Sequence, residues 1–485
     1  MNSTILRNLS LGYLLMPNLI FSIGWFRLPL SVLLVAGIVF IVVFHFRTEN
    51  NSALSLSRKQ TFQIAIISLL IIAFSGVGGF CFQAFDYWAH NSKYYTLFNN
   101  SWPVLFKANG RYACHYFGFF LVPALISKML GELSGIALYI WASIGLFIGF
   151  CWIFVFTGKS YLSLILFLSL GGIGHLIKVV TMRLIGLNYH VPPFFTEIWP
   201  VLYQAQWAPN QLIPIIIVSA ILFHDYVYLK KPERSFIAVI AIFIWGIFPS
   251  IVFVIIFSML MLLRYHNDLR RLFQRKAMID VLVPGLIFIP TFFYFLSGKA
   301  SVIAGFIWQF NPLDQIAFHY FFGVVIDLAV LSGIAYILNL HKSANKRIVT
   351  ALFALLILIS FVRMGKWNDW FLRGNTPVLT LLSLFILQAF SVWTKERPDW
   401  YKLKVSYPLV LFLLLGFIVP MSQIKRALQE NIVTSMLFPD QVKFTPYPYN
   451  QFEDFYELGL NVYSQQEANQ FLGQKGSIYE IYLAR

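Results

Sequence analysis

Long apolar stretches recur along the whole chain, and this pattern constrains the fold more than any other feature of the sequence. A run of about 20 apolar residues is long enough to cross the hydrocarbon core of a bilayer as a helix. With 59% hydrophobic and 12% charged residues over 485 positions, no single soluble core could bury so much apolar surface. The sequence therefore predicts an all-α, polytopic transmembrane helical bundle.

Apolar windows of about 16 to 25 residues predict the individual spans. The first is expected to be a true span rather than a cleaved signal peptide, because similar runs follow throughout the chain. A further run, 236–263, is divided at Pro249 and is expected to form two short helices that meet around 246–250. The resulting total is about 13 crossings. The other predicted spans are 5–25, 28–46, 61–80, 134–157, 161–178, 210–228, 280–297, 318–340, 348–365, 375–393 and 405–420.

Short lysine and arginine clusters separate many of these runs, and loops rich in these residues stay on the cytoplasmic side. The clusters place the N-terminus in the cytoplasm and the C-terminus outside, in what we expect to be the inner (plasma) membrane of a bacterium. Because these loops account for the formal charge of +16, no nucleic-acid partner is expected. The clusters lie within 47–59, 230–234, 264–276, 342–347 and 395–404.

The same charge pattern predicts one long extracytoplasmic loop at 81–133. Within it, the apolar run 116–130 cannot be a simple span and is expected to be an interfacial helix, interrupted at Pro123. After residue 420 no apolar window is long enough to cross a membrane. We therefore expect a transmembrane domain at 1–420 and a small extracytoplasmic region at 421–485.

Acidic residues are rare in the predicted outer loops, and an ionisable group beside a bilayer is costly unless it has a partner or a task. Asp86 follows the third span within "FDYWAHNSKYY", where aromatic neighbours would raise the pKa of its carboxyl and Lys93, Lys107 or Arg111 would lower it. It could act as a general base toward a hydroxyl acceptor, or be an interfacial acid paired with a lysine. The outer-loop acids ahead of the tail are Asp86, Glu132, Glu197, Asp314 and Asp369.

Three basic residues are candidate ligands for a lipid-linked phosphate: Arg111, Lys366 and Arg373. Arginine suits this task because its planar fork binds two oxygens at once. Arg111 could instead be a headgroup anchor. Asp369 and Arg373, at i,i+4, could simply pair and seal a helical hairpin.

A second set of residues has the chemistry of sugar binding, in which aromatic faces stack on the ring and amides bind its hydroxyls. Trp207, Asn210 and Gln211 precede a span, where they could also be an interfacial tryptophan and a helix cap. His90 and His115 could transfer protons or bind a metal, but two histidines 25 positions apart are a weak metal signal. The three cysteines show no metal-ligand spacing, so no metal site is identified and a divalent metal requirement stays open. The candidate substrate-binding residues are His90, His115, Glu197, Trp207, Asn210, Gln211, Asn368 and Asp369.

The acid in "FDYWAHN" and the run "YFGFFLVPALISKMLGELSG" that follows it resemble the GT-C superfamily of glycosyltransferases over about 61–265. These polytopic enzymes use polyprenyl-phosphate-linked sugars, and they carry an acid in their first large extracytoplasmic loop. The segment "RMGKWNDWFLRGNTP" resembles part of large bacterial envelope membrane proteins with this layout. The resemblance implies inverting transfer with Asp86 as base, a lipid-linked sugar donor, a glycan, lipid or protein acceptor, and membrane lipids around the protein. Several families of the superfamily carry a second acid where this chain has Tyr87.

Two other functions remain open. A polymerase or ligase acting on undecaprenyl-diphosphate-linked glycans would rely mainly on Arg111 and His115. A transporter or flippase would use Asp327, which lies inside a predicted span, and the broken run around Pro249. Convergence of Asp86, Arg111, Glu197, Asp369 and Arg373 on one outer-facing cavity would favour the glycosyltransferase, and scattering of these five residues would count against it.

Overall fold

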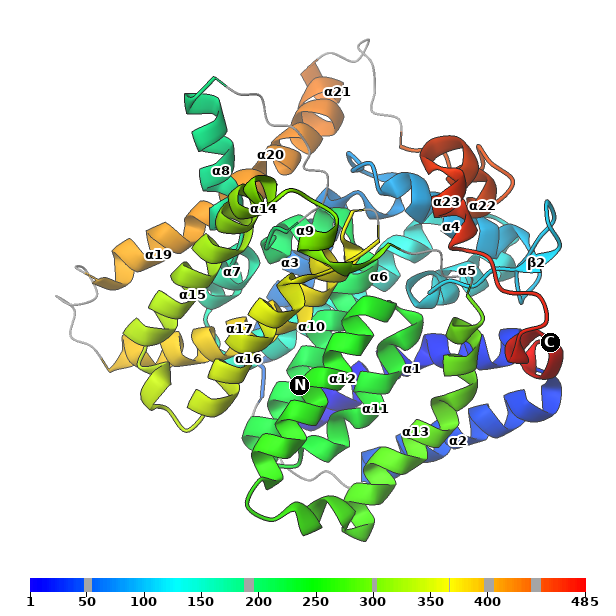
Figure 1. Ribbon diagram of the computed structural model, residues 1–485, viewed down its shortest axis with the longest axis horizontal. Helices are drawn as coiled ribbons and strands as arrows, with labels where there is room; N and C mark the ends of the chain where they lie inside the picture. Colours follow the sequence, from blue (N-terminus) through cyan, green and yellow to red (C-terminus); the bar gives the residue numbers. More distant parts are fainter. Residues whose placement is uncertain (48–54, 187–195, 299–302, 366, 397–404, 438–445) are drawn as a thin grey trace.

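The computed structural model describes residues 1–47, 55–186, 196–298, 303–365, 367–396, 405–437 and 446–485, which form a mostly helical bundle (Figure 1). This confirms the all-α class. The longer helices are α1 (Ser3–Trp25), α2 (Leu28–Arg47), α3 (Arg58–Ser75), α4 (Tyr87–Asn99), α5 (Gly118–Leu130), α6 (Gly135–Phe156), α8 (Ile173–Leu184), α10 (Pro209–Phe223), α12 (Ile247–Tyr265), α13 (Arg275–Leu296), α15 (Ile326–Ile337), α16 (Lys346–Ser360) and α17 (Asp369–Lys395). The shorter ones are α7 (Tyr161–Ser169), α9 (Val201–Trp207), α11 (Phe236–Ala241), α14 (Leu313–Tyr320), α19 (Tyr407–Leu414), α20 (Ile418–Ala427), α21 (Thr434–Leu437), α22 (Phe455–Leu458) and α23 (Gln465–Asn469).

Nine helices in the described ranges are long and apolar enough to cross a membrane, and a tenth is added if the bent pair α7 and α8 counts as one span. A helix satisfies its backbone hydrogen bonds internally, which hydrocarbon requires. Three predicted spans fall outside this set: α1, α11 and α16, the last of which has only 15 residues. The predicted total of 13 crossings is therefore not confirmed.

The predicted span 161–178 is divided into α7 and α8, which are bent by 52° relative to each other. Gly171 and Gly172, between the two helices, have φ angles of 88° and 77°, a left-handed conformation that favours glycine. This break leaves the first amides of α8 without helical partners. The buried Asp327 side chain of α15 accepts hydrogen bonds from Ile173 N and Gly174 N at 3.1 and 3.2 Å. Asp327 thus caps α8, where a negative charge is favoured.

The apolar run 236–263 also breaks, at Gly246, between a short helical stretch and α12. Its two parts are unequal, because α12 has 19 residues and is by itself a candidate span. Pro249 lies in the first turn of α12, where a missing backbone N–H costs nothing. The expected interfacial helix is α5, whose 13 residues run through Pro123, so the predicted interruption there is absent.

Residues 81–133 contain α4, α5 and a two-stranded antiparallel sheet of β1 (Leu105–Phe106) and β2 (Arg111–Tyr112). The C-terminal segment 446–485 packs on this loop, and Figure 1 shows α22 and α23 beside α4. Its backbone joins the loop directly, because Cys114 N donates to Phe471 O at 2.8 Å and Gly473 N donates to Tyr112 O at 2.8 Å. A second antiparallel sheet pairs β3 (Ala304–Phe306) with β4 (Val362–Met364). The second of these strands, β4, precedes α17 in the sequence.

Candidate active site

A cavity of about 520 Å³ lies between the start of α4, α9, the first turns of α17 and the C-terminal segment. Such a concave site, with aromatic walls and a few convergent polar groups, is the usual form of a small-molecule site. Its aromatic side chains are Phe85, Trp199, Tyr203, Trp207, Trp367 and Tyr463. Its ionisable side chains are Asp86, His175, Glu197, Asp369, Arg373 and Glu467.

Asp86 and Arg373 form an ion pair in this cavity, with 3.3 Å between Asp86 Oδ2 and Arg373 Nη2. The side chains of Asp86 and Arg373 are 34% and 11% exposed, so the carboxylate is the more accessible partner. The second guanidinium nitrogen, Nη1, is buried and has no hydrogen-bond partner within the described part of the chain. The pair therefore places a carboxylate and a guanidinium group side by side at the cavity wall.

Burial raises the pKa of the Asp86 carboxyl, while the charges of Arg373 and Lys93 limit that rise. Lys93, on α4, is buried, and its burial lowers the pKa of the ammonium to about 8 against the opposing charge of Asp86. The ammonium lies 5.5 Å from the centroid of the Tyr116 ring and 5.6 Å from that of Phe471. The Lys93 ammonium therefore lies near two aromatic rings, whose faces attract a cation.

Glu197 is held by two basic residues of α8. Its Oε1 lies 2.7 Å from Lys178 Nζ, and its Oε2 lies 2.8 Å from His175 Nδ1. Burial alone would raise the pKa of Glu197, but His175 and Lys178 outweigh it and hold the pKa well below its usual range. A carboxylate fixed in its charged form is a poor proton acceptor, so Glu197 serves as a rigid part of the wall.

Two further residues line the cavity: Asp369, the first residue of α17, and Trp207, the last residue of α9. His90 Nε2 lies 3.0 Å from Trp207 O, and burial together with the Lys93 charge lowers the pKa of His90 to about 3. Asn210 and Gln211 are buried in the first turn of α10 rather than in the cavity wall. Gln211 Nε2 donates to Tyr116 Oη at 3.0 Å.

Arg111, His115 and Asn368 lie outside the cavity wall. Arg111 Nε donates to Gly473 O at 2.7 Å, which ties β2 to the C-terminal segment. His115 is buried, with its ring centroid 3.9 Å from that of Tyr116. The Oδ1 atom of Asn368, just before α17, accepts from Met364 N at 3.4 Å. Lys366 is not among the described residues.

Sequence reasoning missed His175 and Lys178, and it also missed the residues from the C-terminal segment. A lysine within a predicted span, as Lys178 is, signals a nearby acid partner, and His175 shares its helical face at i,i+3. Tyr463 and Glu467 had no comparable signal, since nothing in the sequence of the tail relates it to the loop acids.

The described residues contain no group of three histidine, cysteine, aspartate or glutamate side chains that could hold a metal ion. A divalent metal requirement stays a prediction. Cys81 and Cys114 are buried free thiols. Comparison with protein-family models, curated proteins and solved structures finds no match for this chain.

Proposed function

We propose that this chain is an integral membrane glycosyltransferase that moves a sugar, with inversion, from a polyprenyl-phosphate-linked donor to an acceptor. One observation supports the proposal most directly: Asp86, Glu197 and the α17 residues Asp369 and Arg373, which come from three segments far apart in the sequence, line one aromatic-walled cavity. Four of the five residues whose convergence would favour this function therefore meet, and only Arg111 lies elsewhere. The acceptor would be a glycan, a lipid or a protein.

The cavity offers suitable groups for both parts of such a donor. Trp199, Tyr203 and Trp207 provide flat apolar faces, on which a sugar ring stacks. Arg373 provides a guanidinium group at the cavity wall, and charge-assisted hydrogen bonds from arginine to phosphate are among the strongest in proteins. We assign the donor phosphate to Arg373.

Asp86 would be the general base in a single displacement. The acceptor oxygen attacks the anomeric carbon and passes its proton to Asp86, a new bond forms between that carbon and the acceptor oxygen, and the bond to the phosphate oxygen breaks. The polyprenyl phosphate leaves with the electron pair, next to Arg373, which neutralises its charge. A raised carboxyl pKa makes Asp86 a better proton acceptor than a fully solvated aspartate.

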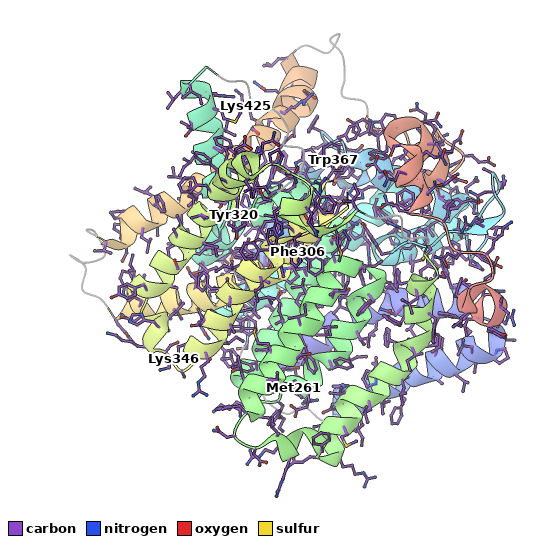
Figure 2. All side chains as sticks on the ribbon, viewed as in Figure 1. Met261, Phe306, Tyr320, Lys346, Trp367 and Lys425 are labelled. Carbon is purple, nitrogen blue, oxygen red and sulfur yellow. The ribbon has the colours of Figure 1, made fainter. Side chains whose placement is uncertain are left out.

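The site would face the extracytoplasmic side. Trp207 of the cavity wall precedes the 20-residue helical stretch Pro209–Tyr228, and Lys230 of the basic cluster 230–234 follows it. The cavity and this cluster therefore lie about 30 Å apart along one helix. Figure 2 likewise shows Trp367 of the cavity wall far from Met261 near the end of α12. The expected basic clusters also meet at that end, because Lys230 and Arg264 line one cavity. Arg347 Nη1 lies 2.7 Å from His266 Nε2, close to the same cluster.

The other two functions receive less support. A polymerase or ligase would use Arg111 and His115, and neither lines the cavity. Arg111 donates to Gly473 O, and the His115 ring packs against Tyr116. Asp327, which suggested a transport path, is engaged in capping α8.

The direct test is to incubate the purified chain with polyprenyl-phosphate-linked sugars and a pool of envelope glycan and lipid acceptors, and to measure released polyprenyl phosphate. We expect release that requires both donor and acceptor and falls strongly in Arg373→Gln. Ion-gradient-driven movement of lipid-linked sugar in vesicles, with no release of polyprenyl phosphate, would favour the flippase instead.

A further inference from the structure

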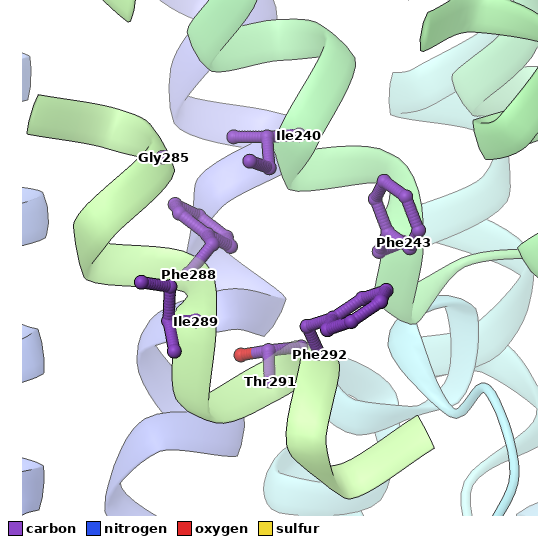
Figure 3. A pocket seen from close by; sticks show the side chains of 7 residues that line it. All are labelled: Ile240, Phe243, Gly285, Phe288, Ile289, Thr291 and Phe292. Atoms are coloured by element: carbon purple, nitrogen blue, oxygen red, sulfur yellow. The ribbon is translucent and has the colours of Figure 1, made fainter. Parts of the chain in front are cut away.

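Two cavities lie along helix α13, away from the candidate active site. The first is an apolar groove of about 170 Å³, lined by Ile240, Phe243, Gly285, Phe288 and Phe292 among others (Figure 3). The second is a basic cavity of about 650 Å³, lined by Lys230, Lys231, Arg264 and Arg271 together with Glu233 and Asp268. Both include residues of α13.

The spacing between the two cavities matches half a bilayer. Ala277 lines the basic cavity, and Phe288, eleven residues further along α13, lines the apolar groove. Eleven residues are three helical turns, so the two positions share one face of α13 and lie about 16 Å apart along its axis. The hydrocarbon core of one leaflet is about 15 Å thick. A lipid phosphate in the basic cavity would therefore have its acyl chains beside the groove.

The charges in the basic cavity are unevenly matched. Arg271 Nε lies 3.1 Å from Asp268 Oδ2, and Glu233 accepts a hydrogen bond from Tyr265 Oη at 2.8 Å. Lys230, Lys231 and Arg264 have no carboxylate within 4.0 Å anywhere in the described ranges of the chain. Three cations without an acid partner, in a cavity that shares α13 with an apolar groove, are complementary to an anionic headgroup.

We propose that the α11 and α13 face binds one anionic phospholipid, with its phosphate among Lys230, Lys231 and Arg264 and one acyl chain in the groove at Gly285. This site is separate from the proposed glycosyl transfer and does not depend on it. A zwitterionic phospholipid with the same acyl chains lacks the net charge that the three cations would bind.

Gly285 allows the groove to be filled without disturbing the fold. A Cβ atom added there would meet only Phe236 Cε1, at 3.8 Å, which is an ordinary contact. Gly285→Leu should therefore occupy the acyl-chain position. Gly333→Leu is the matched control, because Gly333 also lies in an apolar helix, α15, and nothing is within 4 Å of an added Cβ there.

The experiment is native mass spectrometry of the full-length chain released from detergent with phosphatidylglycerol or phosphatidylcholine of identical acyl chains. We expect one phosphatidylglycerol bound about tenfold more tightly than phosphatidylcholine. Gly285→Leu and the triple variant Lys230→Gln, Lys231→Gln, Arg264→Gln should each weaken it by about tenfold.

Two controls should retain wild-type affinity: Gly333→Leu, and Lys342→Gln with Lys346→Gln in another basic loop. Equal affinity for the two lipids would overturn the proposal, as would unchanged binding in either test variant. Binding of soluble glycerol phosphate as tight as that of phosphatidylglycerol would show an anion site without an acyl-chain groove and would also overturn it.

Discussion

Asp86 and Arg373, which are 287 positions apart in the sequence, form an ion pair of 3.3 Å between the start of α4 and the second turn of α17. This contact brings the loop after α3 to the loop before α17 and places an acid and a guanidinium in one cavity. A base and a phosphate-binding group, side by side, are the two groups that transfer from a lipid-linked phosphate requires.

Arg373→Gln should weaken the binding of polyprenyl phosphate. A hydrogen bond to a charged group is worth about 1.5–3 kcal/mol, so we expect Kd to rise by about tenfold to a hundredfold. The acid limb of the activity profile should also move to higher pH, because Arg373 lowers the pKa of Asp86 and its removal lets that pKa rise. Calorimetric titration with polyprenyl phosphate and a pH series of initial rates test both effects.

Arg111→Gln is the matched comparison. Its lost hydrogen bond to Gly473 O should cost about 1 kcal/mol of stability and leave the Kd for polyprenyl phosphate unchanged. The reverse result, with affinity lost in Arg111→Gln and retained in Arg373→Gln, would favour the polymerase or ligase.

Lys93 should set the alkaline limit of activity. Its pKa is lowered to about 8, so the ammonium is charged below that pH and loses its charge above it. Because this charge favours the ionised form of Asp86 and would stabilise a leaving phosphate, we expect the rate to fall as the pH rises through about 8. In Lys93→Arg the charge persists and the fall should move to higher pH. An unchanged alkaline limb in that variant would show that the Lys93 charge does not set the alkaline limit of activity.

The buried pair of Lys178 and Glu197 should contribute to stability as a unit. Lys178→Met leaves a buried carboxylate with only His175 as its basic partner, and breaking such a pair costs about 3–5 kcal/mol. Adding Glu197→Gln removes that charge and should recover part of the loss. Thermal unfolding of the two single variants and the double variant measures the coupling, and strictly additive losses would show that there is none.

The C-terminal segment should shape the site for the acceptor. Tyr463 packs edge-on against Phe85, with ring centroids 5.8 Å apart, and both line the cavity. Tyr463→Ala should raise the acceptor KM severalfold while leaving the affinity for polyprenyl phosphate unchanged, because Arg373 is retained. Tyr482→Ala, at an exposed tyrosine of the same segment, is the control. Equal effects of the two substitutions would show only a general loss of packing.

Hydropathy and loop charge predicted the membrane bundle and the position of Asp86 just beyond a spanning helix. These features are local, since they depend on the apolarity of one segment and the lysines and arginines beside it. The bounds of α6, Gly135–Phe156, follow for the same reason, because they match the expected span 134–157.

The partners of the charged residues could not be predicted in this way. The i,i+4 spacing left open a pair between Arg373 and Asp369. In the structure Arg373 instead pairs with Asp86, because the packing of α17 against the loop decides which carboxylate is near. Asp327 was a candidate for a transport path only in the transporter or flippase alternative. Asp327 caps α8 because the chain bends at Gly171 and Gly172, which leaves the first amides of α8 free to donate to it. Hydropathy does not predict such a bend or the contact that depends on it.

The most direct test of the proposed catalytic site is the turnover of Asp86→Asn on a polyprenyl-phosphate-linked sugar. Release of polyprenyl phosphate and donor binding are measured on the same preparation. We predict that kcat falls by about a thousandfold, the usual scale of a lost general base, while donor Kd stays within about threefold of wild type. Glu132→Gln, at an exposed loop acid outside the cavity, should keep full activity. Wild-type turnover by Asp86→Asn would contradict the assignment of this cavity as the catalytic site.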